Sequence, residues 1–180
     1  MQTLAGPTPG GLVVARRRWV AWLWLPVLFV LVAVGLWWMG HPAALPLADR
    51  TVTASAKVEQ RVYVGVTVDG SVDRELAISK AAFRTAGDST NGLDADGLEV
   101  EAWICRDGAI SQTTAPDRFC DDVIPAEGNS LRLGNDQLMV SIQSTAAVAL
   151  HLEPVELTFR DGLQRGTDPF GPEYEFVVIG

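Results

Sequence analysis

An uninterrupted apolar run from Trp19 to Met39 is the feature that most constrains this chain, because it contains no charged side chain. A helix of this length measures roughly 30 Å at about 1.5 Å rise per residue, which matches the hydrocarbon core of a bilayer. Signal-peptide apolar regions are shorter, about 7 to 15 residues, and are followed closely by small residues at a cleavage site. No such site follows this run, so the sequence predicts a retained transmembrane helix over residues 19–39.

The residues that flank this run predict its orientation. Arginines precede it, and tryptophans lie at both of its ends, as in the aromatic belts of retained membrane helices. Because basic residues stay on the cytoplasmic side, residues 1–18 are expected to be a short cytoplasmic tail and the rest to lie outside the cell membrane. A Pro-containing linker over residues 40–50 would follow the helix. The flanking residues are Arg16, Arg17, Arg18, Trp19, Trp37 and Trp38.

The charge of the chain beyond the helix limits its partners. The sequence has 14 Lys and Arg and 22 Asp and Glu. Setting aside the three arginines before the helix leaves 11 basic against 22 acidic residues, a net charge of −11. A surface of this sign repels nucleic acids, so DNA or RNA binding is disfavoured.

Residues 51–180 have the pattern of a single β-domain. Between Val52 and Val68, small and branched apolar side chains recur at even positions, with mostly polar ones between them. A period of two over this length indicates strands with one face in a core. Further short strand-like runs follow, among them Leu98–Arg106 and Gln137–Ser144, separated by turn signals such as Asp96-Gly97 and Asp161-Gly162. The C-terminal stretch over residues 155–179 is expected to form a strand, a long turn and a final strand. The predicted fold class is all-β, an antiparallel β-sandwich after one transmembrane helix.

Two stretches carry a resemblance to a known group of proteins. They are "RVYVGVTVDGSVDRELAISKAAF" and "VELTFRDGLQRGTDPFGPEYEFVVI", and the second contains the segment Arg160-Asp161-Gly162-Leu163-x-x-Gly166-Thr167. In these stretches the chain resembles the immunoglobulin-like ectodomains of uncharacterised actinobacterial single-span membrane proteins. The resemblance implies an immunoglobulin-like fold and a place in the cell envelope, and it carries over no catalytic residue.

Cys105 and Cys120 are the two cysteines of the chain. An even pair in an extracytoplasmic domain usually oxidises, and neither the CxxC spacing nor the partner histidines of a redox or metal site are present. We therefore expect a structural disulfide, worth about 3 kcal/mol for a loop of about 15 residues.

Few residues suggest catalysis. His151 lies inside an apolar run, where a histidine is usually structural. Glu99 and Glu101 share one face of a predicted strand, so their carboxylates are expected to lie near each other, as the carboxylate pair of a glycosidase does. Such a pair on a solvent face usually serves solubility. No catalytic residue and no cofactor are predicted, and a hydrolase that uses His151 or this glutamate pair remains the enzymatic alternative.

Calcium binding is a second alternative, because Asp94 and Asp96 lie in an acidic, Gly-containing stretch. Aligned on Gly97 as the sixth position of an EF-hand loop, the pattern fails, since position one is Gly92 and position twelve is Trp103. We therefore predict no metal site and keep a calcium-stabilised adhesion domain as an alternative. The preferred function is a membrane-anchored binding or scaffolding module. Its expected partners are the bilayer, through residues 19–39, and another envelope or membrane protein.

Overall fold

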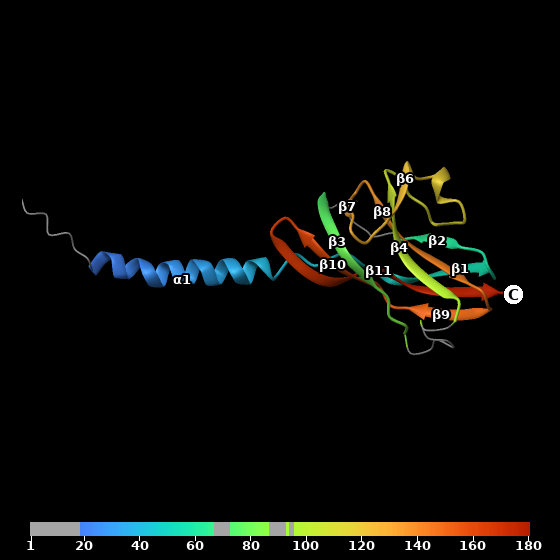
Figure 1. The fold of residues 1–180 in the computed structure, drawn as a ribbon, viewed down its shortest axis with the longest axis horizontal. Coiled ribbons are helices and arrows are strands. Elements are labelled where there is room, and N and C mark those ends of the chain that lie inside the picture. The colour runs from blue at the N-terminus through green and yellow to red at the C-terminus, as the bar shows by residue number, and fades with distance from the viewer. Residues whose placement is uncertain (1–18, 67–72, 87–92, 94–95) are drawn as a thin grey trace, which may run out of the picture. The chain divides into compact units, whose positions relative to one another are not determined.

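The computed structural model describes residues 19–66, 73–86, 93 and 96–180, with side chains from Trp24 onward (Figure 1). It forms two compact units, Met1–Trp37 and Trp38–Gly180. Helix α1 covers Trp19–Met39, the bounds predicted from the apolar run, and contains Pro26. Among the described residues, no helix is both long and apolar enough to cross a membrane.

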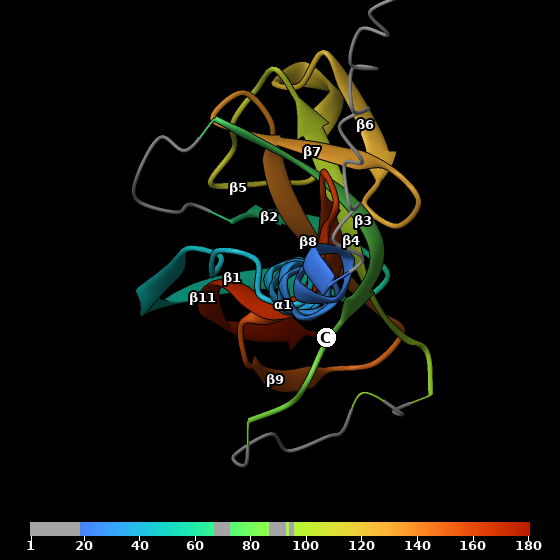
Figure 2. The ribbon, with the colours of Figure 1, turned by 90° about the vertical axis from the view of Figure 1, so that its left-hand side faces the viewer.

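The second unit is all-β, and its two sheets pack face to face as predicted for a sandwich (Figure 2). The first sheet has six strands, in the order β1-β11-β10-β3-β7 with β9 also paired to β11. They are β1 (Leu47–Lys57), β3 (Arg74–Ala82), β7 (Ser130–Leu133), β9 (Val148–Leu152), β10 (Val155–Asp161) and β11 (Gln164–Ile179). The second sheet has the order β5-β2-β8-β4-β6. Its strands are β2 (Val62–Gly65), β4 (Leu98–Arg106), β5 (Gln112–Thr113), β6 (Asp122–Pro125) and β8 (Gln137–Ser144), and the 3-10 turn η1 (Pro116–Arg118) precedes β6.

The expectation of a wholly antiparallel sandwich needs one correction, because β1 pairs with β11 in parallel from Thr51↔Glu173 to Lys57↔Ile179. The other strand pairs among the described residues are antiparallel. A short hairpin imposes antiparallel pairing, and a long connection does not. Nearly the whole domain separates β1 from β11, so their relative direction is set by packing and is not visible in the local sequence.

The even-numbered apolar positions that the structure describes face the core, but they are shared between two strands in different sheets. Val68 lies outside the described residues. Ala54 and Ala56 of β1 and Val62 and Val64 of β2 are all buried. Between the strands the chain turns at Glu59, which has a positive φ of 64°. At this turn the chain passes from the first sheet to the facing second sheet. Side chains at even positions therefore point into the shared core from both strands. The period of two therefore predicted which side chains are buried, but it did not indicate that the chain turns between β1 and β2.

The C-terminal stretch differs from the expected strand, long turn and strand. The turn is confined to Gly162 and Leu163, and β11 then runs unbroken over Gln164–Ile179. Its first half pairs with β10, and its second half pairs with β1 and β9. The change of partners falls at Gly171, whose φ is 85° and where a Cβ would come within 2.2 Å of Val66. Glycine permits both the bend and this close approach.

The expected linker over residues 40–50 is part of the domain. Strand β1 begins at Leu47, and Leu45 is buried in the main core. The N–H of Gly171 donates to the carbonyl of Pro46 at 3.1 Å. An apolar side chain and a backbone hydrogen bond thus fix the C-terminal part of the predicted linker to the domain.

Tyr174 is among the largest side chains in the core and is fully buried. Its ring stacks on Phe176, with 5.8 Å between the ring centroids. Burial raises the pKa of its phenol, and its hydroxyl has no hydrogen-bond partner among the described residues. A buried polar group left without a partner costs about 1–3 kcal/mol.

We therefore expect Tyr174→Phe to raise the free energy of unfolding by about 1 kcal/mol, because the ring stays and the unsatisfied hydroxyl is removed. Urea denaturation monitored by tryptophan fluorescence measures this change. Tyr63→Phe, at a half-buried ring of β2, is the control and should have a smaller effect. A clear loss of stability in Tyr174→Phe would show that the hydroxyl makes a stabilising hydrogen bond.

Candidate functional site

A groove of about 320 Å³ opens along the outer edge of β4. Four consecutive residues of β4 line it, and they alternate between the two faces of the sheet. Because both faces contribute, the groove is centred on the backbone edge of the strand. Facing side chains come from β3 and β6. The lining residues are Ala81, Phe83, Val100, Glu101, Ala102, Trp103, Pro125 and Glu127.

The backbone of β4 is open along this groove. Strand β6 pairs with β4 from Trp103 to Arg106 only, and the carbonyl of Ala102 accepts the N–H of Ala126 at 2.9 Å. Alternate residues of a strand direct their N–H and C=O groups to the same side. Leu98 and Val100 therefore direct theirs outward, where no strand among the described residues pairs with them.

On the opposite wall of the groove, one backbone donor is occupied by a side chain. Glu127 accepts the backbone N–H of Ala81 through its Oε1 at 2.9 Å, which occupies an edge donor of β3. Natural sheets often block edges in this way with charged side chains. On the β4 wall, by contrast, no strand among the described residues pairs with the outward groups of Leu98 and Val100. The carboxylates of Glu101 and Glu127 lie at the rim of the groove.

Glu99 and Glu101 share a strand face as predicted, and the structure adds a cation between them. The Arg61 guanidinium of the neighbouring segment donates to Glu99 and to Glu101, both at 2.7 Å, and to Gln143 at 3.0 Å. Both glutamates are about half exposed or more. The pair is thus a surface ion-pair cluster on the outer face of the second sheet.

His151 lies on β9 and is half-buried. Its Nε2 is 3.4 Å from a carboxylate oxygen of Glu173 on β11, a contact that is ionic only when the imidazole is protonated. The structure therefore places this histidine beside an acidic side chain on the six-stranded sheet. Glu99 and Glu101 lie on the other sheet, so the two sets of candidate catalytic residues are not brought together.

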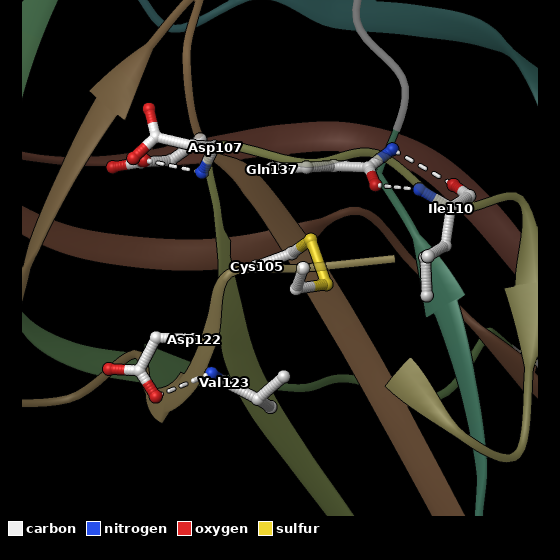
Figure 3. Close-up of a disulfide and its surroundings, with 8 residues drawn as sticks. Cys105, Asp107, Ile110, Asp122, Val123 and Gln137 are labelled. Carbon is white, nitrogen blue, oxygen red and sulfur yellow. Dashed lines mark hydrogen bonds between the residues drawn. A yellow bond between two sulfur atoms is a disulfide. The ribbon is translucent and has the colours of Figure 1, made fainter. Parts of the chain in front are cut away.

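The predicted disulfide between Cys105 and Cys120 is confirmed (Figure 3). Both cysteines are buried in a second, smaller core with Ile110 and Met139. Gln137 holds the same loop by a pair of bonds, accepting from Ile110 N at 2.7 Å and donating to Ile110 O at 3.1 Å. The bridge thus closes a loop that covers the outer face of the second sheet.

Asp136 is a buried charged side chain that the sequence did not indicate. Its carboxylate is fully buried and accepts from Arg132, at 2.8 Å from Nη2 and 3.0 Å from the backbone N–H, and from the Arg106 guanidinium. Burial alone would raise the pKa of Asp136. The hydrogen bonds donated by Arg132, by the backbone N–H of Asp107 and by the Arg106 guanidinium outweigh this effect and hold the pKa at about 2. The hydrogen bonds that Arg132 donates to the carboxylates of Asp136 and Asp107 raise the pKa of its guanidinium.

This network is structural, because each of its members is engaged by another. Arg132 also pairs with Asp107 at 2.9 Å. Arg132 and Asp136 flank the β7–β8 turn, while Arg106 and Asp107 end β4, so the carboxylate joins the two sheets at this end of the domain. The spacing of four between Arg132 and Asp136 was visible in the sequence, but the convergence of Arg106 was not.

The candidate calcium ligands lie in a partly described region. Asp94 lies outside the described residues, and Asp96 is exposed in the turn before β4. Among the described residues, no group of three or more His, Cys, Asp or Glu side chains is arranged to hold a metal ion.

The residues expected to orient the anchor are described only at its C-terminal end. Arg16, Arg17 and Arg18 lie outside the described residues, as does the side chain of Trp19. Trp37 and Trp38 are exposed at the end of α1.

No protein-family model matches the chain, and no curated protein matches it either.

Proposed function

We propose that the protein is a membrane-anchored, extracytoplasmic binding module that docks a segment of another membrane or envelope protein on the open edge of β4. The proposal assigns the anchor to residues 19–39, with the N-terminus cytoplasmic. The apolar run, its arginine and tryptophan flanks and the extracytoplasmic character of a disulfide support this assignment. In this proposal the domain is a binding module and not an enzyme.

The single observation that carries the proposal is a strand edge in an apolar groove, with which no strand in the described part of the chain pairs. Outward N–H and C=O groups of Leu98 and Val100 would give main-chain hydrogen bonds to an added strand. Phe83, Trp103 and Pro125 would give pockets for its alternate side chains. Glu101 is already paired with Arg61, so the carboxylate of Glu127 is the rim charge that favours a partner segment with a basic residue beside its apolar ones.

The finer assignment to an immunoglobulin-like fold belongs to the same proposal. Its support is the two-layer β-architecture of about the expected size. One feature differs from antibody domains, because the disulfide joins β4 to a covering loop on the outer face and does not join the two sheets.

Site-specific photo-crosslinking tests the groove. With benzoylphenylalanine in place of Phe83 in the full-length protein in its native membranes, we expect a crosslink to one membrane-fraction protein. The matched control is the same probe at Phe119, an exposed aromatic side chain that does not line the groove. Pro125→Arg should abolish the crosslink at position 83, since an arginine would fill the groove.

Glu127→Gln tests the charge at the rim. Glutamine keeps the oxygen that accepts Ala81 N–H but removes the negative charge, so the crosslink at position 83 should become several-fold weaker and more salt-tolerant. Equal crosslinking at positions 83 and 119, or crosslinking at 83 that Pro125→Arg leaves unchanged, would refute the groove as the docking site.

A further inference from the structure

We infer that the turn of the β10–β11 hairpin, centred on Leu163, rests in the headgroup layer of the bilayer and fixes the domain against the membrane. This inference rests on the proposed anchor, residues 19–39. It concerns a surface distinct from the β4 groove, and its partner is a lipid surface.

The hairpin turn lies at the chain segment that leaves α1. The side-chain Nε2 of Gln164, the first residue after the turn, donates to the carbonyl of Trp38 at 2.9 Å and to that of His41 at 3.2 Å. Trp38 is the penultimate residue of the helix, so an anchor over residues 19–39 places it at the membrane interface. The turn must then lie at the interface too, whatever angle the helix makes with the domain.

Further contacts hold the segment after α1 to the hairpin and its neighbouring strand. Pro42 packs on the backbone of Gly166, so closely that a Cβ at residue 166 would come within 2.5 Å of the proline ring. The guanidinium of Arg74 on β3 donates to the carbonyl of Ala43 at 3.3 Å. The segment is therefore docked over several residues, and the domain has no free spacer with which to move its hairpin away from the bilayer.

The turn carries the side chains that suit a headgroup layer. Leu163 is 62% exposed at its tip, so its side chain is free to enter an apolar phase that lies against the turn. Arg160 and Arg165 are exposed on either side of it, and the Nε of Arg160 donates to the carbonyl of Gly162 at 2.6 Å. An apolar tip between two arginines can place the leucine among acyl chains and the guanidinium groups among phosphates.

Acidic side chains near the turn limit the part that charge plays. Asp161 is paired with Arg74 at 2.9 Å. Asp73 and Glu75, at the start of β3, line the same open hollow as Arg160. The local charge is thus nearly balanced, so burial of Leu163 should dominate and the contact should depend only weakly on salt.

An environment-sensitive nitrobenzoxadiazole label tests this contact in the full-length protein reconstituted in nanodiscs. The disulfide leaves no free thiol, so Leu163→Cys provides a single labelling site. We expect blue-shifted emission and quenching by lipids that carry a nitroxide near the headgroup, nearly unchanged between low and high salt. Ile179→Cys is the matched control, because Ile179 is a similarly exposed apolar residue at the other end of β11, and its label should emit as in water.

A third label at Gly35→Cys, within α1 and with open space around it, separates this inference from the proposed anchor. A label at 35 that is quenched by acyl-chain nitroxides, together with one at 163 that emits as in water, would overturn the hairpin contact and leave the anchor intact. A label at 35 that emits as in water would overturn the anchor itself and the hairpin contact with it. Equal quenching at 163 and 179 would show label-driven adsorption and would also overturn the inference.

Discussion

Asp136→Asn should lower the free energy of unfolding by about 3–5 kcal/mol, because it leaves two guanidinium groups around a buried site without their shared anion. The carboxylate is fully buried and receives bonds from Arg132 and Arg106. Asparagine keeps the shape but supplies one oxygen and a donor amide that faces other donors. Equilibrium urea denaturation at neutral pH measures the loss.

Asp107→Asn is the matched control from the same network. Asp107 is 48% exposed and its ion pair with Arg132 is open to solvent, so its removal should cost about 1 kcal/mol or less. Asparagine also tolerates the positive φ of 45° at this position. If both variants lost a similar free energy of unfolding, the larger effect expected at Asp136 could not be attributed to its burial.

The pH dependence of stability provides a second readout for Asp136. Its pKa is lowered from an ordinary value of 3.8 to about 2, so the folded state binds its proton less readily than the unfolded state does. Its contribution, roughly 2 kcal/mol, is therefore fully present above about pH 4 and is lost as the pH falls toward 2. The difference in stability between the wild type and Asp136→Asn should shrink across this window, and a constant difference would argue against the assignment.

Removing the disulfide by Cys105→Ala with Cys120→Ala should cost about 3 kcal/mol, within a usual range of about 2–5 kcal/mol. The bridge closes a loop with a sequence separation of 15 residues and lies inside the smaller core. The loop between the cysteines covers Met139 and Trp103, so protection of its amides against hydrogen exchange should fall first.

The double variant loses two sulfur atoms as well as the disulfide bond. Reduced wild-type protein is the control, because it lacks the disulfide bond but keeps both cysteine side chains. Its denaturation midpoint should fall close to that of the double variant. If the reduced protein stays as stable as the oxidised one, packing of the cysteines and not the cross-link holds the loop.

Much of the strand content could be predicted from the sequence, because strict alternation and Asp-Gly turns are local signals. The predicted runs at Leu98–Arg106 and Gln137–Ser144 match β4 and β8 residue for residue. The turn at Gly162 follows from Asp-Gly chemistry as well. Strands β5 and β6 were missed, since β5 consists of two polar residues and the four residues of β6, Asp-Val-Ile-Pro, do not alternate.

The features that could not be predicted depend on residues far apart in the chain. Asp136 has an ordinary local sequence, and its role becomes visible only when Arg106 lies beside it. The groove beside β4 exists because β6 is shorter than β4 and pairs with only part of it. No local motif encodes the relative lengths of these two strands. Similarly, nothing near Pro42 or Pro46 indicates that their segment docks on β11.

The parallel pairing of β1 with β11 has a consequence for how the chain folds during synthesis. Strand β1 emerges early, but the strand that pairs with it, residues 164–179, emerges more than a hundred residues later. Pairs of such high sequence separation form slowly, and until they form β1 remains an unpaired edge that is open to aggregation. Once β11 is in place, it joins β1, β9 and β10, so this late strand completes the six-stranded sheet.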